Sequence, residues 1–153
     1  MSLTEDLLRA NERYATEQFT GADLQVRPLR HVAILTCMDS RYTAQGVMGL
    51  ALGDAHVIRN AGGRVTEDAI RSLVLSAALL GTRACVVIHH TDCGLFGQSD
   101  EQLRQRVAEV AGARATFGFL PFADLEQSVR DDLHALQASP YFPPDYEIGR
   151  AHV

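Results

Sequence analysis

The sequence predicts an α/β protein: a single domain with a mostly parallel central β-sheet flanked by helices. Three short apolar runs that contain β-branched residues, at 31–36, 55–59 and 84–89, are typical of buried strands. Segments with helical periodicity alternate with these runs, and this alternation favours a parallel sheet. The chain has 153 residues, of which 46% are apolar, which is enough for one domain, 1–153, with its own core.

The N-terminal part begins with an expected helical arm, residues 1–28. We expect its helix to have Thr4 as N-cap, followed by two acidic residues whose charge suits the first turn. A loop then leads into the first strand. The elements expected in the first sixty residues are a helix at 4–17, a strand at 31–36, a short helix at 43–50 and a strand at 55–59 that ends in NAGG.

The C-terminal part carries stronger helix signals. Two of its helices begin with a capping-box pattern, a short polar residue followed three positions later by Gln. The elements expected here are a helix from Thr66 to Gly81, a strand at 84–89, a helix from Ser99 to about Ala111 and a helix from Asp124 to about Ala138. The Pro-rich tail, 139–153, is expected to be a truncated edge strand.

The composition argues against several classes of protein. The formal net charge is −5 without a basic cluster, which argues against nucleic acid or an anionic membrane as a partner. The apolar stretches are far shorter than a membrane span. The N-terminus has no apolar signal core, and the three cysteines lack the spacing of a secreted disulfide framework. We therefore expect a cytoplasmic protein whose cysteines serve metal binding or catalysis.

Two of the expected strand ends carry residues that suit a metal ion. The stretch ILTCMDSRY ends the first strand with Cys37, and VVIHHTDCG ends the third with His90 and Cys93. In open α/β sheets, sites form at the carboxyl ends of the strands. If these two strands are neighbours, two thiolates and an imidazole converge. Such a set suits zinc and leaves a fourth tetrahedral position open, as in catalytic zinc sites.

Asp39 and Arg41 follow Cys37 closely, and we expect both to act beside the metal. An arginine can grip a carboxylate with two hydrogen bonds, which fixes its orientation and keeps it ionised. A carboxylate held in this way has two uses. It can accept a hydrogen bond from zinc-bound hydroxide and orient it, or it can occupy the fourth position and close the site.

With these residues in place, the sequence resembles the β-class carbonic anhydrases, and most of all a compact bacterial branch of that family. The similarity lies in CMDSR at 37–41, RNAGG at 59–63 and HTDCG at 90–94, in this order and with helix-sized gaps. It covers roughly residues 30–95 well and the terminal helices more loosely. The three motifs together are quite specific, whereas any one alone is a weak signal.

The resemblance implies a reaction, a cofactor and an assembly. The reaction is the reversible hydration of carbon dioxide to bicarbonate and a proton, with one Zn²⁺ per chain. The site residues implied are the zinc ligands Cys37, His90 and Cys93, the catalytic dyad Asp39 and Arg41, and the carbon dioxide pocket loop Asn60, Ala61, Gly62 and Gly63. The resemblance also implies a homodimer or a dimer of dimers, with the cleft at the subunit boundary and the N-terminal helix on the partner.

Two alternatives to this function stay open. Some relatives of this fold hydrolyse carbon disulfide with the same zinc set, and the shape of the pocket decides between the substrates. The protein could instead be a zinc-stabilised binding or sensing domain without turnover, in which Asp39 fills the fourth position. A cysteine-nucleophile enzyme is disfavoured, because no glycine-rich arch separates Cys37 from Arg41. The chain has no Trp, so a Trp-dependent bicarbonate regulatory site cannot be present in that form.

Other reactive residues have simpler interpretations. Cys85 lies inside a strand and is expected to be part of the core, as free Cys commonly is. His89 precedes His90, but successive strand residues face opposite ways, so we expect His89 to be packed or hydrogen-bonded and not a ligand. Arg59, just before NAGG, is either structural or part of a dimer contact, and the sequence leaves both open.

Overall fold

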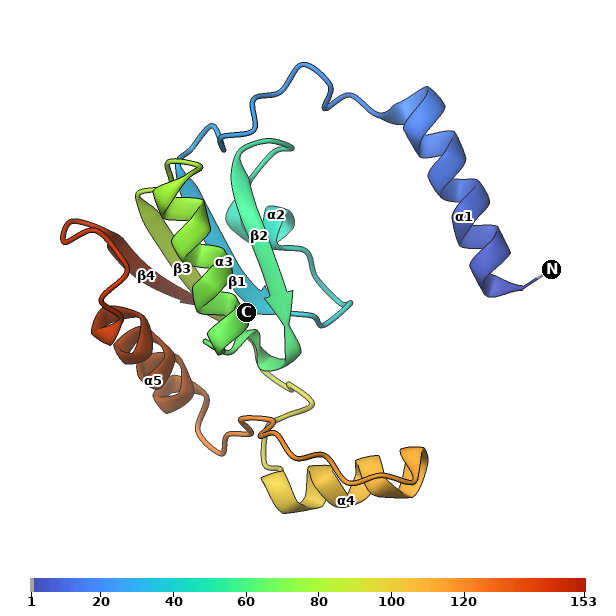
Figure 1. Cartoon of the computed structure of the whole chain (residues 1–153), viewed down its shortest axis with the longest axis vertical. Helices are drawn as coiled ribbons and strands as arrows, with labels where there is room; N and C mark the ends of the chain where they lie inside the picture. Colours follow the sequence, from blue (N-terminus) through green and yellow to red (C-terminus); the bar gives the residue numbers. More distant parts are fainter. Residues whose placement is uncertain (1) are drawn as a thin grey trace.

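The computed structural model, which describes residues 2–153, contains one parallel sheet in this range (Figure 1). Its four strands lie in the order β2-β1-β3-β4, and every neighbouring pair is parallel. The strands are β1 (Val32–Cys37), β2 (Ala55–Asn60), β3 (Ala84–His89) and β4 (Glu147–His152). The predicted α/β class with a parallel central sheet is therefore confirmed.

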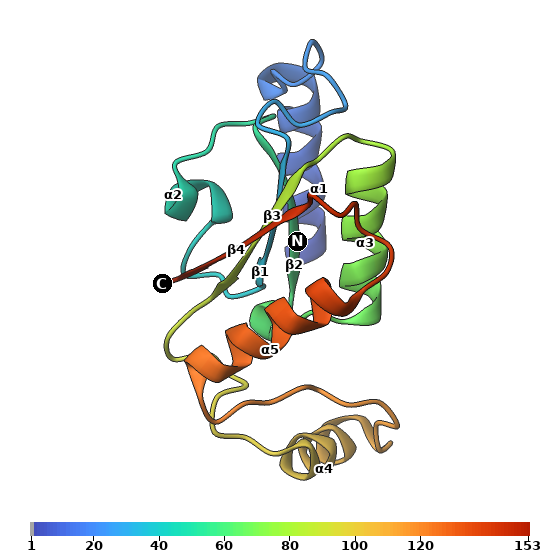
Figure 2. The same cartoon turned by 90° about the vertical axis from the view of Figure 1, so that its left-hand side faces the viewer.

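Helices cover both faces of this sheet. The helical segments are α1 (Leu3–Arg13) with a π-helical continuation (Tyr14–Gln18), α2 (Ala44–Met48), a 3₁₀ turn (Ala61–Gly63), α3 (Glu67–Ala78), α4 (Asp100–Ala111) and α5 (Leu125–Ala138). Helices α3 and α5 pack on one face, and α2 packs on the other (Figure 2). Helix α4 lies beyond the carboxyl ends of the strands (Figure 1).

Strand β1 is buried on both faces because helices cover the sheet on both sides. Leu35 packs in a cluster with Leu73 of α3 and Leu136 of α5, whereas Ile34 packs in the opposite cluster with Ile88 of β3 and residues of α2. A strand covered on both sides needs apolar residues at successive positions. This is why the strand is visible in the sequence as a continuous apolar run.

The strand order creates a switch point between β1 and β3. The chain passes from β1 to the edge strand β2 on one side, and then crosses over β1 to reach β3 on the other side. The connections that leave β1 and β3 therefore diverge at their carboxyl ends, and open α/β sheets bind ligands in the crevice that this leaves. The two strands that carry the expected ligands are neighbours, as the metal-site hypothesis required.

The tail contains a six-residue strand, where the sequence analysis led us to expect a truncated one. Strand β4 pairs with β3 along its full length, from Ala84 opposite Glu147 to His89 opposite His152. Tyr146, just before it, donates a hydrogen bond to the carbonyl oxygen of Ala84. An edge strand with partly exposed side chains needs no apolar run, so the sequence pattern alone shows it only weakly.

The N-terminal helix begins with a capping box at Ser2. Ser2 accepts from the backbone N–H of Glu5, and the Glu5 carboxylate accepts from the backbone N–H of Ser2. The expected N-cap, Thr4, is therefore wrong. Leu7 and Leu8 of α1 remain exposed, and the helix stands away from the sheet (Figure 1). No helix within residues 2–153 is long and apolar enough to cross a membrane, and the cytoplasmic location stays a prediction.

Candidate metal centre

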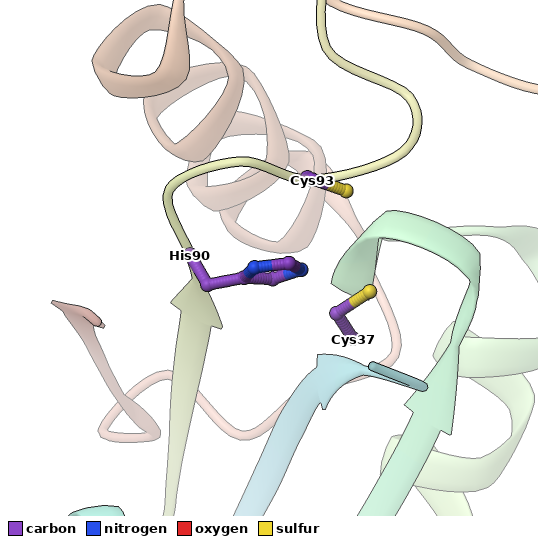
Figure 3. Close-up of side chains that lie close together, drawn as sticks. All are labelled: Cys37, His90 and Cys93. Atoms are coloured by element: carbon purple, nitrogen blue, oxygen red, sulfur yellow. The ribbon is translucent and has the colours of Figure 1, made fainter. Parts of the chain in front are cut away.

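Cys37, His90 and Cys93 meet at the switch point between β1 and β3 (Figure 3). Cys37 is the last residue of β1, His90 directly follows β3, and Cys93 lies in the loop beyond it. Their ligand atoms lie within 4.8 Å of one another, and all three residues are buried. Two sulfur ligands of a tetrahedral zinc ion lie about 3.8 Å apart, so a small closure of the site around an ion is sufficient.

His90 presents one nitrogen without a partner to this space. Its Nδ1 lies 2.8 Å from the carbonyl oxygen of Thr91, so Nδ1 carries the proton and donates it to that oxygen. Nε2 then carries the lone pair. This atom is buried and has no hydrogen-bond partner among residues 2–153. Because an unpaired buried nitrogen is costly, a cation that it can bind is the fitting occupant.

The two thiols fit a divalent cation for an electrostatic reason. Burial raises the pKa of the Cys93 thiol, and the neighbouring Cys37 raises it further. Two thiolates side by side repel each other, and a dication offsets both the burial and the repulsion. Two sulfurs with one imidazole form a set that zinc accepts well. The residues of the site therefore fit zinc.

Asp39 lies at the edge of the metal centre and is held by Arg41. Its Oδ2 is 3.8 Å from Nε2 of His90. Arg41 donates from Nη2 to Oδ2 at 2.8 Å, from Nε to Oδ1 at 3.0 Å, and from its backbone N–H to Oδ1 at 2.9 Å. These hydrogen bonds hold the pKa of Asp39 well below its usual value and raise the pKa of Arg41. Both side chains are therefore charged around neutral pH.

Arg41 also binds the second loop of the site. Its Nη1 donates to Oδ2 of Asp92 at 2.9 Å, and its Nη2 donates to the carbonyl oxygen of Asp92 at 2.9 Å. The guanidinium thus joins the loop of Cys37 to the loop of His90 and Cys93. Asp92 is not among the residues predicted from the sequence, although its position inside HTDCG, between two expected ligands, is a signal for it.

The NAGG turn packs against the strand ends that carry the ligands. Gly63 has a φ of +66°, and a Cβ there would lie 2.9 Å from the backbone nitrogen of Cys37 and 2.9 Å from the carbonyl oxygen of Ile88. Only glycine fits this approach. Asn60 closes the turn, because it both accepts from the N–H and donates to the carbonyl of Arg64, at 2.8 Å each. The role of this turn in a carbon dioxide pocket stays a prediction.

A second cluster of charged residues lies near the site, on the side of α5. Arg64 donates from Nε to Oδ2 of Asp132 at 2.8 Å and from Nη1 to the carbonyl oxygen of Leu120 at 2.7 Å. Nε2 of His89 lies 3.0 Å from the same Oδ2, and its Nδ1 is hydrogen-bonded to Oγ of Ser128 at 2.9 Å. The prediction that His89 is packed or hydrogen-bonded is confirmed. Arg64 and Asp132 were not predicted as partners, and no local pattern connects them.

Fold and site together define a class: α/β proteins with a thiolate–imidazole metal centre at the switch point of a parallel sheet. A family model described as carbonic anhydrase matches residues 32–114. The β-carbonic anhydrase 1 of Mycobacterium tuberculosis is 40% identical over 141 residues, which cover 92% of this chain and 85% of that protein. The chain belongs to the β-carbonic anhydrase family. Zinc is the cofactor of this family, in agreement with the donor set described above.

Solved structures give the same result. The carbonic anhydrase from Streptococcus mutans has a TM-score of 0.90 and 46% sequence identity, and the match covers 99% of this chain and 92% of that one. A carbon disulfide hydrolase from Saccharolobus solfataricus is 52% identical over 92 residues, but these are 60% of this chain and 43% of that protein. The sequence similarity to the hydrolase thus covers a shorter part of the chain. The fold similarity does not: a solved carbon disulfide hydrolase has a TM-score of 0.68 and 27% sequence identity, and the match covers 97% of this chain and 84% of that one.

Proposed function

We propose that the protein catalyses the reversible hydration of carbon dioxide to bicarbonate and a proton, at one zinc ion held by Cys37, His90 and Cys93. The observation that carries this proposal is the convergence of three ligand atoms beside a carboxylate that is fixed by Arg41. A site that only stabilised the fold would use a fourth protein ligand, whereas a catalytic zinc keeps one position open.

Zinc, when bound, lowers the pKa of water to about 7 and so supplies a nucleophile at neutral pH. The residues of the chain orient that nucleophile. Asp39 is ionised and can only accept hydrogen bonds, so it accepts one from the attacking water and turns a lone pair towards the carbon of carbon dioxide. Arg41 keeps Asp39 in the ionised form and in one orientation.

The contacts of Asp39 support an open site over a closed one. Both of its carboxylate oxygens accept hydrogen bonds from Arg41. If Oδ2 moved onto the metal, it would lose the 2.8 Å bond to Nη2 of Arg41. The non-catalytic alternative, in which Asp39 is the fourth ligand, requires that loss.

We also propose that the active form is a homodimer. On one chain the dyad lies near the open surface, since the Arg41 side chain is 56% exposed. Helix α1 exposes Leu3, Leu7 and Leu8, each by 62% or more. A partner chain that covers α1 would bury this apolar stripe.

Light scattering on the wild-type protein should give the mass of two or four chains. The double variant Leu7→Glu, Leu8→Glu should dissociate into single chains. A monomeric wild-type protein would contradict the proposed homodimer.

The first test of the function is stopped-flow hydration of carbon dioxide, near pH 7 and near pH 8.5, on protein whose zinc content is counted in the same batch. We expect rapid turnover with one zinc per chain. Absence of turnover at full zinc occupancy would contradict the proposed function.

The ligand assignment has its own test with a matched control. Cys37→Ala and Cys93→Ala should each lose zinc and stability, because metal affinity and folding are coupled. Cys85→Ala is the control: Cys85 is fully buried in β3, burial raises its pKa to about 12, and it lies outside the metal centre. It should keep one zinc per chain. Unchanged zinc content in both ligand variants would refute the assignment.

Carbon disulfide is the second candidate substrate, because the chain is similar to a carbon disulfide hydrolase across the segment that contains the motifs. The same zinc-loaded protein should be assayed for sulfide release from carbon disulfide. Sulfide release faster than carbon dioxide hydration would favour this alternative.

A further inference from the structure

We propose that Arg59 is a positioning residue that fixes the backbone between Cys37 and Asp39 and thereby sets the place of the Asp39 carboxylate beside the metal. The inference rests on the proposed function, because it concerns the same site. The sequence left open whether Arg59 is structural or part of a dimer contact, and the inference favours the structural role. Arg59 lies in β2, a different strand from the one that leads into the Asp39 loop.

The side chain of Arg59 reaches across to two carbonyl groups of this loop. Its Nε donates to the carbonyl oxygen of Cys37 at 2.8 Å, and its Nη2 donates to the carbonyl oxygen of Asp39. Between them, the backbone N–H of Met38 donates to the carbonyl oxygen of Asn60 at 2.8 Å. Three backbone polar groups of the loop are thus bound to residues 59 and 60. Since each peptide unit is planar, binding these groups fixes the course of the chain from Cys37 to Asp39.

The far end of this loop is held to β1 by the hydrogen bond between Tyr42 and Thr36, but the segment between Cys37 and Asp39 has few other contacts. The Met38 side chain is 67% exposed and contributes little packing. Arg41 grips the Asp39 carboxylate, but Arg41 belongs to the same loop and moves with it. Its other contact, Asp92, lies in a second loop. The segment from Cys37 to Asp39 is therefore anchored to a neighbouring strand by β2, through Arg59 and the carbonyl of Asn60.

Arg59 is itself held in place by an aromatic residue. Its guanidinium carbon lies 5.3 Å from the centre of the Tyr42 ring, a cation–π arrangement. The Tyr42 hydroxyl donates to Oγ1 of Thr36 at 2.7 Å, because the Thr36 hydroxyl donates its own hydrogen to the carbonyl of Ile88 at 3.1 Å. The Tyr42 ring also lies 5.4 Å from the ring of His90. The guanidinium is therefore oriented before any metal or substrate binds.

Lysine cannot replace arginine in this arrangement. The planar guanidinium offers donors in a fixed fork, so one side chain serves two carbonyl groups at once. The ammonium of a lysine is a single point of charge on a flexible stem. Arg59→Lys therefore separates the effect of geometry from the effect of charge, and Arg59→Ala leaves space that a guanidinium ion from solution can enter.

The experiment compares Arg59→Ala and Arg59→Lys with Arg71→Ala as control. Arg71 is an exposed arginine of α3 that pairs with Asp68 away from the site. Three quantities are measured on protein with counted metal: the rate of carbon dioxide hydration, the visible spectrum of the cobalt(II)-substituted protein, and the recovery of rate in millimolar guanidinium chloride. The cobalt spectrum reports the ligand geometry of the metal, and it responds to Arg59 through Cys37, the ligand whose carbonyl oxygen Arg59 binds. It therefore remains informative if carbon dioxide is not the substrate.

We expect Arg59→Ala to retain the metal and to lose about 10- to 100-fold in rate, as is typical when a partner of a metal site is removed. The cobalt spectrum of Arg59→Ala should differ from that of the wild type. The rate and the spectrum of Arg59→Lys should lie between those of Arg59→Ala and the wild type. Guanidinium should restore part of the rate of Arg59→Ala. Arg71→Ala should match the wild type. A cobalt spectrum unchanged in Arg59→Ala, or a loss of rate that guanidinium does not reduce and that follows thermal stability alone, would overturn the inference.

Discussion

Two clusters in this protein use the same three types of residue in opposite surroundings. In one, Arg41 binds Asp39 beside His90; in the other, Arg64 binds Asp132 beside His89. The two histidines are successive residues. Residues at successive positions of an extended chain point to opposite sides, so one ring faces the metal centre and the other faces α5.

The clusters differ in their contact with water. The Arg41 side chain is 56% exposed, whereas that of Arg64 is 10% exposed. In the buried cluster, further hydrogen bonds satisfy the charges: Asp132 accepts from the backbone N–H of Val65, and Arg64 binds the carbonyl of Leu120. The exposed cluster shares its arginine with Asp92 at the surface. Residue type alone therefore does not assign a role to a cluster. Burial makes one cluster structural, and access makes the other suitable for chemistry.

The largest effect is expected at Asp39. Asp39→Ala should keep zinc, because the three ligands remain, and lose about 10²- to 10⁴-fold in rate, the usual contribution of a positioned acid–base group. The zinc content is determined in the same batch of protein on which stopped-flow hydration of carbon dioxide gives the rate. Stability should change little, since the pair is at the surface. A fully active Asp39→Ala protein would remove Asp39 from the mechanism.

The buried cluster should respond in the opposite way. Asp132→Ala leaves the Arg64 charge buried without its partner, which typically costs about 3 to 5 kcal/mol of unfolding free energy. Urea unfolding measures this loss. Asp68→Ala, which breaks the exposed pair with Arg71, is the control and should cost less than about 1 kcal/mol. Similar losses in both variants would show that burial does not separate the two kinds of pair.

The pH dependence of the rate should depend on Arg41. Arg41 holds the pKa of Asp39 below its ordinary value of 3.8, so the wild-type carboxylate stays ionised in weak acid. In Arg41→Gln that pKa rises, and a growing fraction of Asp39 becomes protonated as the pH falls. The ratio of variant to wild-type rate should therefore decrease between about pH 6 and about pH 4.5, with zinc counted at each pH. A constant ratio would mean that Arg41 does not control the charge of Asp39.

The smallest effect is expected at Asp92. Asp92→Ala removes one exposed ion pair with Arg41 but leaves the hydrogen bond from Arg41 to the backbone carbonyl at this position. Exposed pairs contribute at most about 1 kcal/mol and are screened by salt. The rate should therefore fall less than about 5-fold, and the fall should be larger at low ionic strength. A loss as large as that of Asp39→Ala would place Asp92 in the reaction itself.

Local signals in the sequence predicted much of the fold. Ser99 and Gln102 form the expected capping box at α4, and Thr66 caps α3 as expected. At α5, Asp124 accepts from the backbone N–H of Gln127, but the Gln127 side chain binds Asp131, so only half of the expected box forms. These features depend on residues within one turn, which is why the sequence alone reveals them.

The metal centre was also predictable in outline. The ligands were placed by their position at strand ends, and the site required only that β1 and β3 be neighbours. The prediction that Cys85 belongs to the core is confirmed by its complete burial. Residue type and position relative to a strand end were sufficient, because parallel strands bring their carboxyl ends to one edge of the sheet.

The contacts between residues that are distant in the sequence depend on the tertiary structure. Arg64 and Asp132 are 68 positions apart, and Arg59 meets the carbonyl oxygen of Cys37 from a neighbouring strand. A local pattern does not encode such pairs, because each depends on strand order, register and the direction of side chains. Local sequence features show which residues can bind zinc and where the strands and most helices begin. The packing of the sheet against α5 determined which charges are buried, and therefore which of two similar clusters stabilises the fold and which is free to act on a substrate.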